Sequence, residues 1–174
     1  YFIQNIVLQL ITFYSYEDLK LVVFTNESKK DNWDYIRYLN HNFTNDKSIR
    51  LFSTNIESSK KLSEFLNYEV NVRLVNKDNP KFEKKPHYFI ITDDYNSIKR
   101  FDFIKTITEE DTNIGFSVVI LEERLSKLPS KCNNFISLSG SGSAVLKNSY
   151  EKQEQIIFAE DINSNIDMMA VAKK

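Results

Sequence analysis

Two consecutive aspartates, Asp93 and Asp94, are the first side chains in this sequence whose position suggests chemistry. They follow a short apolar run, Pro86 to Thr92, which lacks a helical period and so predicts a strand buried on both faces. Open α/β sheets place their ligand crevice at the carboxyl ends of such strands. In a nucleotide hydrolase, an aspartate at this point holds Mg²⁺ and the next acid orients water. The sequence therefore indicates Asp93 as a candidate magnesium ligand, and Asp93 with Asp94 as a candidate catalytic pair.

The same two aspartates also have a purely structural interpretation. Aspartate is common where a strand turns, and the following Asn96 and Ser97 are suitable helix caps. A strand that ends and leads into a helix needs no further explanation. Both interpretations stay open on the residues alone.

A phosphate-binding loop of the form G-x-x-x-x-G-K-[ST] does not occur in the sequence. Its glycines are Gly115, Gly140 and Gly142, and the Ser-Gly-Ser-Gly-Ser segment at 139–143 lacks a lysine and is predicted to turn a β-hairpin. If the longer protein has a phosphate loop for this domain, we expect it just upstream of Tyr1, where it would lead into the helix that opens the chain. ATP and Mg²⁺ are thus possible cofactors that the sequence itself does not establish.

Other kinds of site have weaker support in the sequence. Cys132, His41 and His87 are too few and too far apart for a structural zinc site, and neither histidine lies in a recognisable nucleophile context. The polar residues 122–124 follow a predicted strand at 116–121 and form either a sensor group or an ordinary strand exit.

Composition indicates a single domain spanning residues 1–174. The 23 basic and 24 acidic side chains nearly cancel, so no nucleic-acid partner is expected. A single cysteine excludes an internal disulfide, and no apolar stretch is long enough to span a bilayer. The sequence lacks an initiator methionine and begins inside a helical pattern, so we expect a fragment of a longer protein.

Alternating strand and helix patterns predict a three-layer α/β domain with a mostly parallel central sheet flanked by helices and a β-hairpin toward the C-terminus. We expect helices at 1–13, 33–39, 56–66, 97–108 and 163–172; strands at 19–25, 49–53, 89–92, 116–121 and 155–159; an edge strand over 70–74; and hairpin strands at 135–138 and 144–146.

The short helix at 33–39 carries three large aromatic residues, Trp33, Tyr35 and Tyr38. At 3.6 residues per turn, Tyr35 and Tyr38 lie about 160° and about 140° from Trp33, so the three cannot share one buried face. Trp33 is expected to face inward with Ile36, which leaves at least one tyrosine accessible. Alanine at Tyr35 or Tyr38 is therefore predicted to leave folding nearly unchanged.

Several segments resemble the EssC/EccC family, the membrane-anchored FtsK/SpoIIIE-type ATPases of type VII secretion. The similarity spans almost the whole chain, and its Trp-Asp and Pro-His segments are the most specific. The matching residues are Leu8-Gln9-Leu10 through Phe13-Tyr14-Ser15, Glu17-Asp18-Leu19 through Val23, Asp31-x-Trp33-Asp34-x-x-x-Tyr38-Leu39-x-His41, Pro86-His87 through Ile91, and Leu128-Pro129-x-x-Cys132.

This resemblance implies a P-loop-ATPase-like domain between the transmembrane helices and the first motor domain of such a protein. It implies a location at the cytoplasmic face of the membrane, contact with the membrane through the parent chain only, and an oligomeric assembly with other domains and subunits of the secretion machine. Asp93-Asp94 stands where a Walker B strand has Asp-Glu. Aspartate is one methylene shorter than glutamate, so the resemblance transfers metal binding to Asp93 more readily than water activation to Asp94.

Three functions follow from these observations. The first is a degenerate ATPase-like module that couples the membrane part to the motor domains and has weak or no activity. The second is an ATP-hydrolysing domain that uses Asp93 for Mg²⁺ and takes its phosphate-binding residues from outside this chain. The third, a receiver-type regulatory domain, requires a lysine at the end of a later strand, and no lysine is placed there.

Overall fold

The computed structural model describes residues 2–132, 134–138, 143–148, 156–159 and 166–174. Its core is a four-stranded sheet in the order β2-β1-β3-β4, in which every neighbouring pair is parallel. The predicted parallel sheet is thereby confirmed. Its strands are β1 (Leu19–Phe24), β2 (Phe52–Ser53), β3 (His87–Thr92) and β4 (Phe116–Ile120).

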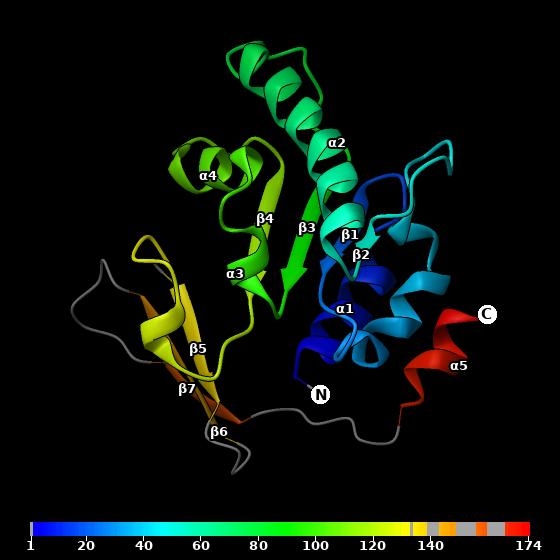
Figure 1. Ribbon diagram of the computed structural model, residues 1–174, viewed down its shortest axis with the longest axis vertical. Coiled ribbons are helices and arrows are strands. Elements are labelled where there is room, and N and C mark those ends of the chain that lie inside the picture. The colour runs from blue at the N-terminus through cyan, green and yellow to red at the C-terminus, as the bar shows by residue number, and fades with distance from the viewer. Residues whose placement is uncertain (1, 133, 139–142, 149–155, 160–165) are drawn as a thin grey trace.

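Helices cover both faces of this sheet, so the predicted three layers are also confirmed (Figure 1). Val22 and Phe24 of β1 pack into one core, whereas Leu21 and Val23 pack into the other, as the period of two in a strand requires. The first core receives α2 (Ile56–Val75), α3 (Tyr95–Ile98) and α4 (Asp102–Glu109); the second receives α1 (Phe2–Phe13), the 3₁₀ helix η1 (Lys30–Tyr38) and α5 (Met168–Ala172).

A second, antiparallel sheet follows β4 and confirms the predicted hairpin. The strand expected near the C-terminus joins this small sheet as its third member. Its strands are β5 (Asn134–Leu138), β6 (Ser143–Asn148) and β7 (Ile156–Ala159). The glycine turn at 139–142 and the start of the helix predicted at 163–172 lie outside the described residues.

The edge strand predicted over 70–74 is wrong, because α2 continues through this segment to Val75. Alternating valines and leucine imitate a strand, yet the buried positions of α2 recur at helical spacing: Leu62, Leu66, Val70 and Arg73. The helix begins where the sequence predicts. Asn55 accepts a hydrogen bond from the Ser58 backbone N–H, and the Ser58 hydroxyl accepts one from the backbone N–H of Asn55.

Three other segments differ in extent from the prediction. The helix expected at 97–108 is divided into α3 and α4, because Phe101 between them has an extended backbone. The helix expected at 33–39 begins at Lys30 and has 3₁₀ geometry. The strand expected at 49–53 is reduced to Phe52–Ser53. The described residues also include two short 3₁₀ turns, η2 (Asn40–Asn42) and η3 (Leu125–Lys127).

The Arg73 guanidinium joins the end of α2 to the amino ends of β3 and β4. It is 2% exposed, and it donates hydrogen bonds to the carbonyls of Pro86, Ile114 and Gly115. Its Cζ atom lies 4.8 and 4.7 Å from the ring centres of Tyr88 and Phe116, which stack on each other. A Glu69 carboxylate oxygen lies 3.6 Å away. Buried charge is tolerated when it is paired and hydrogen-bonded, and Arg73 has both an acidic neighbour and three carbonyl acceptors.

Gly115 is the residue that makes room for this guanidinium. Its φ is +83°, and a Cβ placed there would lie 2.4 Å from Arg73 Nη1 and 2.8 Å from the Lys84 carbonyl oxygen. Gly115→Ala is therefore expected to lower the free energy of unfolding by about 2 kcal/mol or more, through both the left-handed backbone and the clash. Urea denaturation followed by circular dichroism measures this, with Ser126→Ala in η3 as the control; equal stability of the Gly115 variant and wild type would contradict it.

Candidate functional site

The carboxyl ends of β1 and β3 form the edge of the sheet where a ligand crevice is expected. The order β2-β1-β3-β4 equals the first four strands of the doubly wound order 2-1-3-4-5, whose topological switch point lies between β1 and β3. At this point, the chain leaves β1 through Thr25 to Lys29 and leaves β3 through Asp93 and Asp94. The structure thus places both predicted aspartates at the switch point.

Asp93 is held by the loop and the 3₁₀ helix that follow β1. The indole N–H of Trp33 donates to Asp93 Oδ2 at 2.8 Å, and the Lys29 ammonium donates to the Asp93 carbonyl oxygen at 2.9 Å. Trp33 is 3% exposed, so this indole is part of the core on the α1 face. One carboxylate oxygen of Asp93 therefore stabilises the fold, because it accepts the hydrogen bond of a buried tryptophan.

The other carboxylate oxygen of Asp93 is buried and has no hydrogen-bond partner among the described residues, and the same is true of Thr25 Oγ1. Phe24 pairs with Thr92, so Thr25 and Asp93 are neighbours one residue beyond the paired strands. A threonine hydroxyl and an aspartate carboxylate are the protein donors that hold Mg²⁺ beside a nucleotide in P-loop enzymes. These two oxygens fit a magnesium ion only as part of a larger donor set, in which phosphate oxygens and water supply the remaining positions.

The described residues do not form a metal centre built from protein ligands alone. Within the described part of the chain, no cluster of three or more histidine, cysteine, aspartate or glutamate side chains has the geometry to hold a metal ion. The Lys29 ammonium donates to the Asp93 carbonyl oxygen and not to its carboxylate. Magnesium binding by Asp93 accordingly stays a prediction that depends on a bound nucleotide.

Asp94 has a different environment from Asp93. Its backbone N–H donates to Thr92 Oγ1 at 3.1 Å, and its carbonyl accepts the Ser97 hydroxyl at 2.8 Å. These bonds close the turn from β3 into α3, as the structural interpretation of this pair predicts. A role of Asp94 in orienting water stays a prediction.

Two partners of Asp93 could not be recognised from the sequence. Trp33 was expected to face inward, and it does, but its hydrogen bond spans sixty positions of sequence. Lys29 stands in a polar loop beside Lys30, where a basic pair usually indicates a solvated surface. Thr25 carries a detectable signal, because it is the last residue of the predicted strand at 19–25, which is rich in β-branched residues.

The two tyrosines of η1 differ in their exposure to solvent. Tyr38 is 52% exposed, which confirms that one aromatic residue stays accessible, whereas Tyr35 is 4% exposed and packs with Trp33 and Ile36. Burial also raises the pKa of the Tyr35 phenol. The prediction that Tyr35→Ala leaves folding nearly unchanged is therefore wrong, since the Tyr35 ring belongs to the core on the α1 face.

Comparison with known proteins identifies weak relatives over nearly the whole chain. The type VII secretion system protein EssC of Staphylococcus aureus (strain NCTC 8325 / PS 47) is 19% identical over 177 aligned positions, which cover 99% of this chain and 12% of EssC. The ESX secretion system protein EccC of Geobacillus thermodenitrificans (strain NG80-2) is 20% identical over 162 positions, which cover 93% of this chain and 11% of EccC.

The chain is weakly homologous to a region of EssC and EccC. It spans about an eighth of the length of these relatives. No family model matches the chain, and no solved structure matches it significantly. Among the described residues, none of the helices has both the length and the apolar character needed to cross a bilayer.

The contact between Trp33 and Asp93 can be tested by removing only the donor. Trp33→Phe keeps an aromatic ring but leaves Asp93 Oδ2 without its partner, so the free energy of unfolding is expected to fall by about 1 to 3 kcal/mol. Asp93→Asn is the matched control, because its amide oxygen can still accept the indole N–H, and it should be the milder change. Urea unfolding followed by circular dichroism suits both variants, since Trp33 is the sole tryptophan. A more stable Trp33→Phe than Asp93→Asn would contradict this assignment.

Proposed function

We propose that this chain is a cytoplasmic, ATPase-like module of a type VII secretion protein of the EssC and EccC kind. In this proposal, the module lies between the membrane part and the first motor domain and couples them mechanically. The observation that carries the proposal is the similarity to two secretion-system proteins over 93–99% of the chain. The partners are other domains of the same protein and neighbouring subunits of an oligomeric machine.

A mechanical role, with weak or no catalysis, is supported by the chemistry at the switch point. The sequence contains no glycine-rich phosphate loop, and the first aspartate after β3 accepts a hydrogen bond from a buried tryptophan. The second aspartate closes the turn into α3. These contacts stabilise the join between η1 and the sheet, and they leave few free groups for phosphoryl transfer, which depends on positioning and charge.

An accessible aromatic side chain on η1 supplies a surface for coupling. Tyr38 is half exposed beside Lys173, whose ammonium lies 4.9 Å from the centre of its ring. Large aromatic residues often dominate binding energy at protein interfaces. We therefore place a contact with another part of the secretion machine at Tyr38.

Tyr38→Ala in the full-length protein is expected to reduce protein export while the isolated chain keeps its circular dichroism spectrum and melting temperature within a few degrees. Tyr68→Ala is the matched control, because Tyr68 is 66% exposed on α2, at the opposite face of the sheet. Tyr35→Ala should instead destabilise the fold by about 3 kcal/mol or more, as a buried aromatic does when truncated. Normal export by the Tyr38 variant would remove η1 from the coupling surface.

The second candidate function is nucleotide binding in its own right. It is favoured by two buried oxygens without a hydrogen-bond partner among the described residues, Thr25 Oγ1 and Asp93 Oδ1, on residues that directly follow the paired ends of β1 and β3. If a nucleotide is bound there, these residues would hold its Mg²⁺, which would neutralise phosphate charge.

Calorimetric titration of the chain with Mg·ATP separates the two functions. The mechanical role predicts no binding tighter than about 1 mM, which corresponds to roughly −4 kcal/mol. Micromolar affinity that is lost in both Asp93→Ala and Thr25→Val would establish the nucleotide site and overturn the mechanical proposal.

A further inference from the structure

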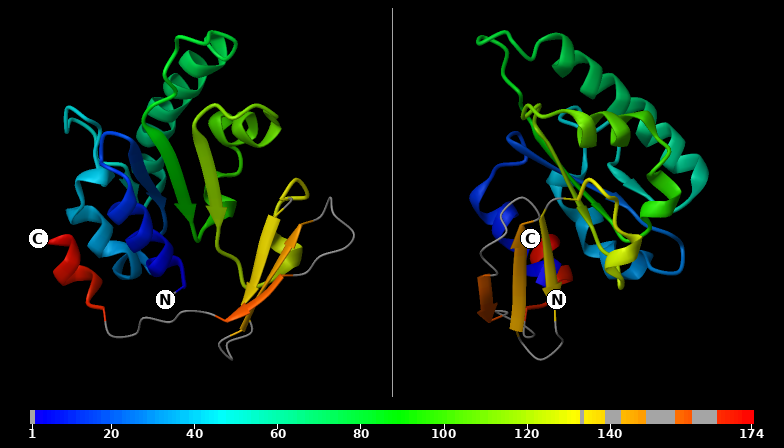
Figure 2. Two further views of the ribbon diagram at one scale, coloured as in Figure 1. Left: turned by 180° about the vertical axis from the view of Figure 1, so that it is seen from behind. Right: turned by 90° about the vertical axis from the view of Figure 1, so that its left-hand side faces the viewer.

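The turn at residues 14–18 leads from the end of α1 into β1. Seen from behind, α1 lies in front of β1 (Figure 2), so this turn sets where the helix ends above the sheet. Within the turn, the backbone N–H groups of Asp18 and Leu19 both donate to the Ser15 carbonyl at 3.0 Å. These local bonds define the shape of the turn, whereas its position on the sheet depends on contacts with other elements.

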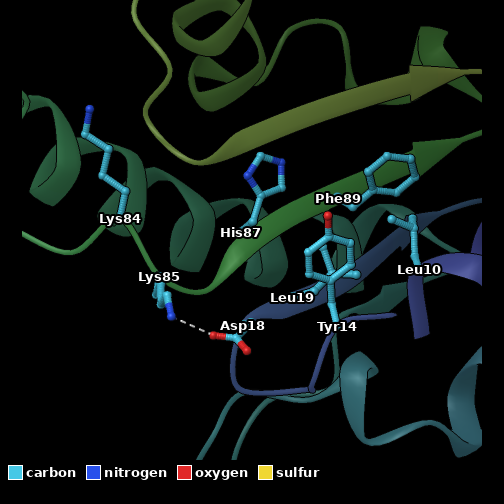
Figure 3. Close-up of a pocket in the computed structure, with 8 residues that line it drawn as sticks. All are labelled: Leu10, Tyr14, Asp18, Leu19, Lys84, Lys85, His87 and Phe89. Carbon is cyan, nitrogen blue, oxygen red and sulfur yellow. Dashed lines mark ion pairs between the residues drawn. The ribbon is translucent and has the colours of Figure 1, made fainter. Parts of the chain in front are cut away.

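On the side of β3, the turn is held by an exposed ion pair. The carboxylate of Asp18 lies 2.8 Å from the Lys85 ammonium, at the mouth of a pocket of about 550 Å³ that the turn forms with His87 and Phe89 (Figure 3). The two side chains are 41% and 63% exposed. Ion pairs in water contribute little to stability, so the stronger contact of the turn is expected elsewhere.

On the side of η2, the turn is held by the buried imidazole of His41. This side chain is 9% exposed, and its Nε2 lies 2.9 Å from the Tyr14 carbonyl oxygen. A carbonyl oxygen only accepts, so Nε2 carries the hydrogen and the neutral ring already has the form that this contact needs. A second proton would place a full charge on a ring that is largely shielded from water.

A second basic side chain lies buried next to this imidazole. Lys20 of β1 is 1% exposed, and its ammonium nitrogen lacks a hydrogen-bond partner in the described part of the chain. It lies 5.4 Å from the centre of the Tyr16 ring, and the same ring meets the His41 ring edge to face at 6.5 Å. Tyr16, Lys20 and His41 thus form one basic cluster between the turn, β1 and η2.

The charges that act on this basic cluster do not balance. Burial lowers the pKa of Lys20, and the Glu17 carboxylate acts weakly in the opposite direction. Burial also lowers the pKa of His41, which the Tyr14 carbonyl raises and the Lys20 charge lowers further. The only charged neighbour that influences His41 among the described residues is therefore another cation.

We propose that the basic cluster of Tyr16, Lys20 and His41 is an acid-sensitive switch, which holds the turn and the end of α1 on the sheet while His41 is neutral and releases them when His41 takes up a proton. Protonation adds a positive charge beside an ammonium that already lacks an acidic partner. Movement of Tyr16 and the turn away from β1 gives both cations access to water. This inference is independent of the coupling role, because it depends only on the contacts of the turn.

The direction of the pH dependence follows from the shift at His41. The fold lowers the pKa of this imidazole below its ordinary value of 6.5, so the contact contributes its full stability above pH 6.5 and loses it as the pH falls through the lowered pKa. The pKa of the Asp18 carboxyl is lowered from 3.8, chiefly by its hydrogen bond to Lys85. The ion pair of the turn is therefore lost only in stronger acid.

His87 is the other group that titrates in the same range and lies near the turn. Burial, and to a smaller extent Arg73, lowers the pKa of its imidazole. Its ring nitrogen bonds Ser117 Oγ at 2.9 Å and thus connects β3 to β4, not the turn to η2. A variant at His87 is accordingly the matched control for a variant at His41.

The test measures hydrogen exchange of single backbone amides by nuclear magnetic resonance, as protection relative to the unfolded chain. Between about pH 7.5 and about pH 5, the Leu19 amide of the turn should lose about 10-fold in protection. The Val23 amide, which donates to the Leu51 carbonyl in the middle of the sheet, should keep its protection. His41→Gln should remove the pH dependence at Leu19, because its amide N–H can still donate to the Tyr14 carbonyl but does not titrate.

His87→Gln should show the same acid response at the turn as wild type. Lys20→Met should reduce this response, because it removes the neighbouring charge, whereas Lys60→Met at an exposed lysine of α2 should not. An acid response that persists in His41→Gln, or that disappears in His87→Gln, would overturn the proposal. If His41→Gln does not fold, Lys20→Met decides, since an unchanged response in that variant would overturn it as well.

Discussion

The buried guanidinium of Arg73 is the contact on which the arrangement of this domain depends. It connects one helix to two strands, because three carbonyl oxygens from the starts of β3 and β4 accept its hydrogen bonds and the stacked rings of Tyr88 and Phe116 lie beside it. A charge placed this deeply stabilises one geometry only, since any shift of β4 against β3 would leave a buried donor or acceptor unpaired. The left-handed Gly115 is part of the same contact, because any side chain there would occupy the place of the guanidinium.

The pairing of β1 with β3 and of β3 with β4 continues without a break from the amino ends of these strands to their carboxyl ends. The paired residues run from Leu19 and His87 to Phe24 and Thr92, and onward from Thr92 to Ile120. Thr25 is thereby brought beside Asp93, where η1 supplies the indole of Trp33. The switch point is thus a join between β1, η1 and β3 that the contacts of Asp93 hold together. The strand order is that of an α/β ligand crevice, although the sequence has no glycine-rich phosphate loop.

Local chemistry in the sequence was sufficient for the strands and for most helix positions. Short apolar runs predicted β1, β3 and β4, and Asn55 marked the start of α2. The end of α2 could not be predicted, because Val70, Val72 and Leu74 alternate as in a strand and a buried arginine at position 73 is unusual. The contacts of Asp93 could not be predicted for another reason. They join residues about sixty positions apart in the sequence, and residue types alone do not show which distant residues come together. The sequence located the aspartate, but not the tryptophan that determines its role.

The account is tested most directly by the indole N–H signal of Trp33 in a proton–nitrogen correlation spectrum, because a chain with one tryptophan gives one such signal. The hydrogen bond to Asp93 predicts a signal that exchanges slowly with solvent, moves strongly in Asp93→Ala, and stays in place when Mg·ATP is added to about 1 mM. A rapidly exchanging signal, or one that shifts at micromolar Mg·ATP, would show that Asp93 is free to serve a nucleotide and would contradict the view of this edge as a structural join.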